Sequence, residues 1–90
     1  MRLDLFLKIT RLSPRRAVAQ RLCGAGFVSL NGRAAKAAHL VKPGDEIGVR
    51  QRDREITVRV LKVPLSRHVS RRDASLLIET VNERELQADL

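Results

Sequence analysis

A chain of 90 residues has room for one small domain, and its composition of 43% hydrophobic and 31% charged residues is typical of a folded protein rather than a disordered tail. No apolar run approaches the roughly 18 residues that a membrane span needs, and Met1 to Asp4 leads directly into periodic structure, so we expect neither a membrane segment nor a signal peptide. The single cysteine, Cys23, cannot form an internal disulfide, which fits a reducing cytoplasm.

The positive charge of the chain is confined to its first half. The net charge at neutral pH is +8. Residues 1–44 contain nine basic residues and one acid, Asp4, whereas residues 45–90 contain nine residues of each sign. A basic surface that only serves solubility has no reason to be segregated in this way. The distribution therefore favours a face that binds a polyanion.

The first predicted element is a helix over residues 3–9. Leu3, Phe6 and Leu7 follow the i, i+3, i+4 spacing of a buried stripe. Asp4 lies near the start of this helix, where the helix dipole favours a negative charge.

A second helix is predicted from Ser13 onward. Ser13 is a favourable N-cap, Pro14 suits the first helical position, and Gly24 can end the helix before Gly26. The predicted apolar stripe of this helix consists of Ala17, Val18 and Leu22. Its opposite face is predicted to carry Arg15, Arg16 and Gln20.

This second helix has two cations in its predicted first turn. Arg15 and Arg16 there cost roughly 0.3–1 kcal/mol each compared with acids, because the helix dipole is positive at that end. Free N–H groups at a helix start attract anions. A phosphate ligand would supply the missing negative charge, so the pair predicts a phosphate contact. The simpler alternative is a solvated basic face.

Short strands separated by turns are predicted after the helices. Residues 27–30 are predicted to form a strand, and Asn31-Gly32 is the preferred turn of a type I′ hairpin. Residues 33–34 are predicted to form the returning strand of this hairpin. Residues 35–40 are either a loop or a turn of helix.

The second half of the chain is predicted to continue as a β meander. Residues 46–50 and 55–61 alternate in hydrophobicity with period two, after a turn at 42–45, and a polar hairpin joins them. Residues 74–81 are either a last turn of helix or an extended piece, and the final charged residues are expected to fray. The order of elements predicts an α+β domain.

Aromatic residues are too few for reading unstacked bases. Only Phe6 and Phe27 are present, both at positions typical of a core, and the chain has no Trp or Tyr. Proteins that read single-stranded bases generally use aromatic platforms. Binding is therefore predicted through phosphates and the shape of folded RNA, with little sequence reading. A membrane surface is disfavoured because the basic helices lack an exposed apolar face, and duplex DNA bound by a helix-turn-helix remains an alternative.

The order of motifs between residue 2 and about residue 62 resembles the S4 RNA-binding domain. The motifs are Arg2-Leu3-Asp4-x-Phe6-Leu7-Lys8, Arg11-Leu12, Arg15-Arg16, Gly26-x-Val28-x-Leu30-Asn31-Gly32, Lys36 and Val41-Lys42-Pro43-Gly44-Asp45-x-Ile47-x-Val49. The resemblance implies an α+β, S4-type (αL) fold in which two N-terminal helices pack on a small, mostly antiparallel sheet with a short C-terminal tail. It divides the chain into an S4 RNA-binding domain over 1–62 and a partly ordered extension over 63–90.

Within the S4 superfamily, the short chain resembles the RqcP family of bacterial ribosome-associated quality control. This resemblance implies a cytoplasmic, non-catalytic factor that binds the obstructed large (50S) ribosomal subunit through its rRNA and peptidyl-tRNA. Such a factor would support alanine tailing of stalled nascent chains by a NEMF-family tailing factor on the same subunit. An S4 heat-shock-type factor, which recycles free 50S subunits carrying nascent chains, is the alternative within the superfamily.

The candidate RNA-binding residues come from the family motifs and from charge. Lys8, Arg33 and Lys36 are added on charge alone, and Asp4 is included as a member of the motif. Leu5 stands where relatives often carry a lysine, and Pro14 is unusual before the arginine pair. Residues 73–90 lean acidic and so lack the basic extension of the heat-shock relative. The full set is Arg2, Asp4, Lys8, Arg11, Arg15, Arg16, Arg33 and Lys36.

No residue pattern predicts catalysis or metal binding. His39 and His68 have no arrangement of Ser, Cys or carboxylate near them that suggests a triad, and one cysteine with two distant histidines cannot complete a zinc site. We therefore expect no enzyme activity, no metal and no cofactor. We also expect the protein to be a monomer. A protein adaptor that works through its neutral half is an alternative from a different functional class.

Overall fold

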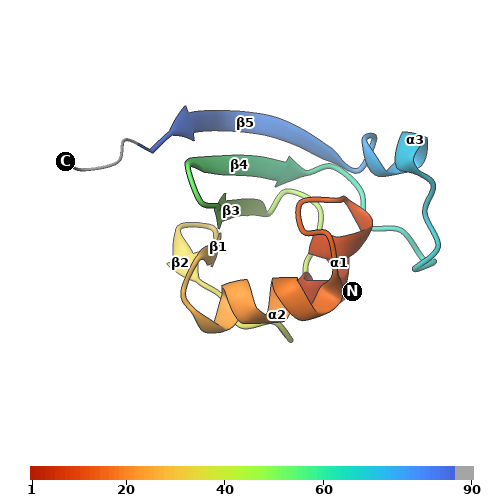
Figure 1. The fold of residues 1–90 in the computed structure, drawn as a ribbon. Helices are drawn as coiled ribbons and strands as arrows, with labels where there is room; N and C mark the ends of the chain where they lie inside the picture. Colours follow the sequence, from red (N-terminus) through yellow and green to blue (C-terminus); the bar gives the residue numbers. More distant parts are fainter. Residues whose placement is uncertain (87–90) are drawn as a thin grey trace.

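The computed structural model describes residues 1–86, and its centre is a five-stranded sheet (Figure 1). The strands lie in the order β2-β1-β3-β4-β5, and every neighbouring pair is antiparallel. The elements are α1 (Leu3–Ile9), α2 (Arg16–Gly24), β1 (Val28–Leu30), β2 (Arg33–Ala34), β3 (Glu46–Arg50), β4 (Arg54–Val60), α3 (Arg71–Ala74) and β5 (Ile78–Glu85). The predicted α+β, S4-type architecture is confirmed. The predicted fraying of the last residues concerns positions 87–90, which lie outside the described part.

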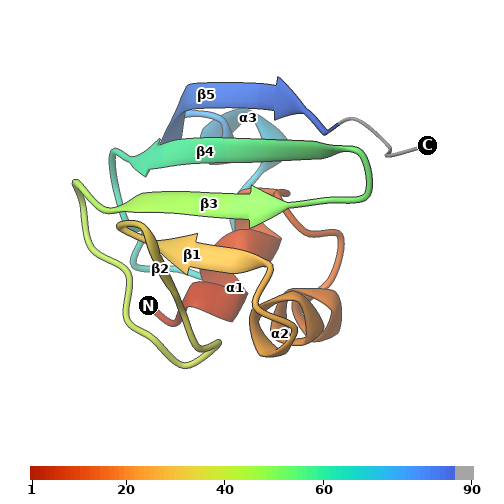
Figure 2. The same ribbon diagram turned by 90° about the vertical axis from the view of Figure 1, so that its left-hand side faces the viewer.

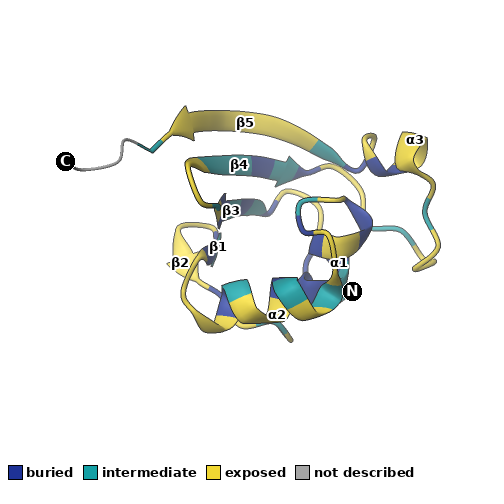
Figure 3. Ribbon diagram, viewed as in Figure 1, coloured by how far each residue is buried: buried dark blue, intermediate teal, exposed yellow. Residues whose placement is uncertain are grey.

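The core forms between α1 and the inner face of the sheet. Leu3, Phe6 and Leu7 are fully buried, as the helical spacing predicted. Alternate residues of β3 and β4 meet them from the sheet, and these are Ile47, Val49, Val58 and Val60. Each such side chain contributes roughly 1.5–3 kcal/mol through burial, so α1 is held firmly against the sheet. Figure 3 shows this burial on α1 and β3, and the exposure of β5.

Helix α2 begins at Arg16, so the predicted start at Ser13 and Pro14 was wrong. Ser13 is buried, its hydroxyl donates to the carbonyl oxygen of Arg15 at 2.9 Å, and its backbone N–H donates to the carbonyl of Leu7 at 3.0 Å. These bonds use Ser13 to fix the turn after α1 rather than to cap α2. Arg15 is therefore the N-cap, with no side-chain capping bond, and Arg16 is the first helical residue.

The end of α2 is a Schellman motif centred on Gly26. Gly26 has a φ of 80°, and its N–H donates to the carbonyl of Cys23, while the N–H of Phe27 donates to the carbonyl of Leu22. Gly24 is the last helical residue, but Gly26 supplies the left-handed conformation. The motif turns the chain directly into β1.

The buried face of α2 also differs from the prediction. Ala19 and Cys23 are buried, whereas Ala17 is exposed, and Val18 and Leu22 are half-buried. The stripe predicted from hydropathy and the stripe of Ala19 and Cys23 are adjacent on the helix, so hydropathy alone does not distinguish them. The packing of α2 against α1 decides which of the two is buried. Burial, followed by the negative charge of Asp4, raises the pKa of the Cys23 thiol, so this residue behaves as a small apolar group.

The predicted Asn31-Gly32 hairpin is confirmed. Both residues have positive φ, 53° and 86°, as a type I′ turn requires, and Leu30 pairs with Arg33 across it. The segment 35–40, left open between loop and helix, is a loop that returns beside the start of α1.

The C-terminal segment contains both of the alternatives weighed for residues 74–81. α3 ends at Ala74, and β5 pairs with β4 from Ile78 onward. Cross-strand ion pairs connect these strands and use charges of both signs from the second half of the chain. The pairs are Arg54–Glu83, Arg59–Glu79 and Arg84–Glu55.

Helices cover one face of the sheet. In Figure 2 α1 and α3 lie behind the strands and α2 lies along the β1 side, so no helix of the described residues covers the face toward the reader. Among residues 1–86 no helix is long and apolar enough to cross a membrane.

Candidate nucleic-acid interface

The candidate interface is organised around one buried carboxylate, that of Asp4. Arg2 donates to Asp4 through Nε and Nη2, each at 3.2 Å. From α2, Arg16 Nε donates at 3.1 Å and Gln20 Nε2 at 2.9 Å. The backbone N–H of Leu5 completes the set at 2.8 Å. Asp4 therefore joins the N-terminal ends of both helices.

The electrostatic state of Asp4 follows from these bonds. Burial alone would raise its pKa, but the hydrogen bonds from Gln20, Arg2, Arg16 and the Leu5 N–H outweigh burial and lower the pKa from 3.8 to about 2. The carboxylate is thus ionised at any physiological pH. It is the fixed negative charge against which two guanidinium groups are oriented.

This burial corrects the expectation for Asp4. Its side chain has no exposed surface and so cannot contact RNA, whereas the side chains of Arg2 and Arg16 are 45% and 36% exposed. Asp4 can act only by positioning the arginines. The line of Arg16 and Gln20, predicted to face away from the core, instead faces α1. One sequence feature could have indicated the positioning role of Asp4: it is the one acid among the first 44 residues.

The 36–40 loop closes the third side of this cluster. The N–H of Leu3 donates to the carbonyl of His39 at 2.7 Å, and the N–H of Asp4 donates to that of Ala37 at 3.1 Å. Arg2 forms an isolated bridge with Leu40. These bonds satisfy free N–H groups at the start of α1 and place the loop that carries Lys36 beside Arg2 and Asp4.

The other predicted cations are exposed and spread around this cluster. Lys8 follows on α1, Arg15 caps α2, and Arg11 lies in the turn between the helices. Arg33 is more distant in the topology, because it follows the hairpin turn on β2, the edge strand beside β1. The structure thus brings Arg2 and Arg16 into one cluster with the Lys36 loop beside it, while Arg33 extends the basic surface along the sheet edge.

Arg11 has a left-handed backbone conformation, with a φ of 65°. This conformation costs a non-glycine residue roughly 1–2 kcal/mol. We expect Arg11→Gly to raise the free energy of unfolding by about 0.5–1 kcal/mol after the greater chain entropy of glycine is subtracted, although it removes a candidate RNA contact. Arg11→Ala keeps the Cβ and should leave the strain in place. Urea unfolding of both variants tests this, and equal stabilities would contradict it.

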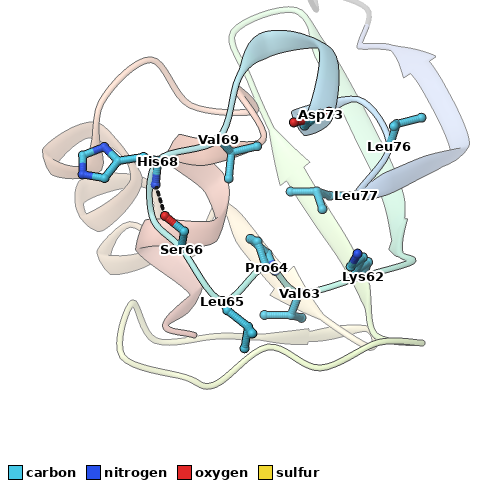
Figure 4. A pocket seen from close by; sticks show the side chains of 10 residues that line it. All are labelled: Lys62, Val63, Pro64, Leu65, Ser66, His68, Val69, Asp73, Leu76 and Leu77. Carbon is cyan, nitrogen blue, oxygen red and sulfur yellow. Dashed lines mark hydrogen bonds between the residues drawn. The ribbon is translucent and has the colours of Figure 1, made fainter.

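A shallow cavity of about 440 Å³ lies away from this cluster, between the 62–69 segment and α3 (Figure 4). Its lining is largely apolar. The ring of His68 points away from Asp73, and the backbone N–H of His68 donates to Ser66 Oγ at 3.1 Å (Figure 4). These polar groups do not form an acid–base pair. Within residues 1–86 there is also no group of three metal-ligating side chains.

Comparisons with known proteins agree on one family. Residues 1–47 match the model of the S4 domain. The chain is 40% identical over 86 residues to the RQC P-site tRNA stabilizing factor of Halalkalibacterium halodurans, covering 96% of each protein. It is 50% identical over 60 residues to the factor of that name in Bacillus subtilis, covering 67% of this chain and 70% of the relative. The structure is similar to heat shock protein 15 of Vibrio cholerae, with a TM-score of 0.82 and 30% identity, covering 90% of this chain and 81% of that one.

Proposed function

The chain belongs to the S4 domain family, and from this premise we propose that it is a non-catalytic RNA-binding factor that stabilises P-site tRNA in bacterial ribosome-associated quality control. It binds the obstructed 50S subunit in the cytoplasm, contacting rRNA and peptidyl-tRNA as a monomer. Through these contacts it supports alanine tailing of the stalled chain by a NEMF-family factor. The RNA-binding unit is residues 1–62, followed by the extension at 63–90.

One observation carries this proposal: a buried carboxylate fixes two arginines where the N-terminal ends of α1 and α2 meet. Arg2 and Arg16 both use Nε for Asp4, so the outer Nη atoms of Arg16 remain available to a ligand. Guanidinium groups held in this way bind phosphate without losing much side-chain freedom. The phosphate contacts are made by Arg2, Lys8, Arg11, Arg15, Arg16, Arg33 and Lys36.

RNA crosslinking of the tagged protein in cells tests the proposal. Ultraviolet crosslinks should map to large-subunit rRNA and to tRNA together, and the tRNA fragments should increase when translation is stalled. An Arg15→Gln/Arg16→Gln variant should lose both sets while keeping its far-ultraviolet circular dichroism. Crosslinks confined to mRNA or DNA would refute the proposal, as would retention of both sets by the variant.

A heat-shock-type role is the second candidate because of the likeness to heat shock protein 15. Recycling of free 50S subunits predicts crosslinks to large-subunit rRNA that increase on heat shock and do not require stalled translation. The two roles are separated by the condition that raises the tRNA signal. A competition assay with duplex DNA and structured rRNA addresses the DNA-binding alternative.

A further inference from the structure

Phe27 is exposed, which corrects the prediction that both phenylalanines belong to the core. Phe6 is fully buried, but 43% of Phe27 remains accessible. The cause is local. Phe27 follows Gly26 at the end of α2, and the next residue, Val28, turns its side chain into the core, so Phe27 projects to the other side of the strand. The ring stands where the uncovered face of the sheet meets the end of α2.

Arg50 lies over this ring, and Arg52 lines a hollow with it. The guanidinium carbon of Arg50 lies 5.8 Å from the ring centre, and the backbone N–H of Arg50 donates to the carbonyl of Phe27 at 2.8 Å. Arg50 and Arg52 form no ion pair within residues 1–86. Two acids lie nearby: Glu55 faces Arg50 across β3 and β4 and contacts Arg84 at 3.4 Å, and Asp53 lies 4.0 Å from Arg54.

Two shallow hollows share Phe27 as a wall. One, of about 190 Å³, is lined by Gly26, Phe27, Ser29, Gly48, Arg50 and Glu55. The other, of about 330 Å³, is lined by Leu22, Phe27, Arg50, Gln51 and Arg52. Both are at or below the lower end of the roughly 300–1,000 Å³ typical of small-molecule sites. They suit a flat group placed on an open surface better than an enclosed ligand.

We propose that Phe27 is a stacking platform for one unpaired RNA base, whose flanking phosphates contact Arg50 and Arg52. The inference rests on the proposed RNA-binding function and adds a second contact point to it. Base–aromatic stacking is tolerant of sequence and needs a single exposed ring with nearby cations. Helix α2, about 13 Å long, lies between Arg16 and this platform, so one folded RNA can reach both.

A purely structural role for Phe27 makes a different prediction. In a Schellman motif the residue at this position often packs on the residue five or six before it, here Leu22, and any apolar side chain can do so. Phe27→Leu preserves that contact and removes the aromatic face. Phe27→Trp preserves both, and it introduces the protein's only tryptophan, since the chain has neither Trp nor Tyr.

The experiment uses two RNA hairpins that differ only by one bulged nucleotide in the stem. Phe27→Leu should bind the bulged hairpin at least about fivefold more weakly than the parent, the lower bound for a stacked base, and should bind the fully paired hairpin equally well. The fluorescence of Phe27→Trp should be quenched by the bulged hairpin far more than by the paired one. Val81→Trp is the matched control, because Val81 on β5 is also 43% exposed.

The outcomes separate this inference from the proposed function. Equal affinity of Phe27→Leu and the parent for the bulged hairpin overturns the stacking platform, as does equal quenching at positions 27 and 81. If the Arg15→Gln/Arg16→Gln variant loses binding to both hairpins while Phe27→Leu binds both as the parent does, the stacking platform is refuted. The proposed RNA-binding function is supported by that same result. Arg50→Gln should weaken only the bulged complex, and thermal unfolding confirms that each variant is folded.

Discussion

Replacing Arg11, Arg15 and Arg16 together with glutamine is expected to lower affinity for structured RNA on the order of 100-fold at about 0.1 M salt. Each phosphate contact on a duplex contributes about −0.9 to the slope of log K against log salt concentration. With five to eight phosphates neutralised, the parent slope should be about −4 to −7, and the variant slope should be shallower by about 2.7. Binding to a 50S-derived rRNA hairpin over a salt series measures both quantities.

The matched control removes the same charge from another part of the fold. Lys62, Arg71 and Arg72 are exposed and lie after β4, in the linker and α3. Changing these three to glutamine also lowers the net charge from +8 to +5. It should leave the slope nearly unchanged, because these groups are outside the proposed interface. Equal losses in the two triple variants would mean that overall charge, rather than the α1–α2 surface, drives binding.

Asp4→Asn is expected to destabilise the fold by about 2 kcal/mol and also to weaken RNA binding. The stability loss corresponds to the lowering of the Asp4 pKa from 3.8 to about 2. The amide places an N–H group against the donors of Arg16 or Gln20, and the arginines lose the charge that orients them. Urea unfolding at pH 7 measures the first effect, and RNA titration below the unfolding transition measures the second.

The difference in unfolding free energy between the parent and Asp4→Asn should depend on pH in one direction. Because the folded-state pKa of Asp4 lies below its unfolded-state value, the ionised carboxylate stabilises the fold fully above about pH 4. That contribution is lost as the pH falls through about 2. The gap in unfolding free energy between the parent and Asp4→Asn should therefore be constant between pH 7 and about 4.5 and shrink below that range. A constant gap down to pH 2 would contradict the argument.

The affinity measurement distinguishes positioning from simple charge. Removing a negative charge makes the basic surface more positive, so a charge-only account predicts unchanged or tighter RNA binding by Asp4→Asn. Positioning predicts weaker binding, because Arg2 and Arg16 would need to be ordered by the ligand itself. Gln20→Met is a useful companion, since it removes one donor to Asp4 without changing any charge.

Local sequence patterns were sufficient for the elements that depend on nearby residues. The spacing of Leu3, Phe6 and Leu7 predicted the buried face of α1, and Asn31-Gly32 predicted the hairpin, because both signals act within a few residues. Segregation of charge pointed to the α1–α2 half as the candidate interface, and the ordered motifs indicated the S4 fold.

Contacts between distant segments decided the rest. Ser13 could not be recognised as a buried turn residue, because its role depends on how α1 meets α2. The exposure of Phe27 depends on the direction in which the chain leaves Gly26, and no helix of residues 1–86 covers that face of the sheet.

By itself, the sequence determined that this protein is a small α+β domain with a basic amino-terminal half. Only the tertiary structure decided that Asp4 lies beneath the arginines rather than among the ligand-binding groups. Arg16 and Gln20 are 12 and 16 residues away along the chain, and they reach Asp4 only after the two helices pack. Burial of a charged group is a property of the packed pair of helices, and no periodicity within either helix encodes it.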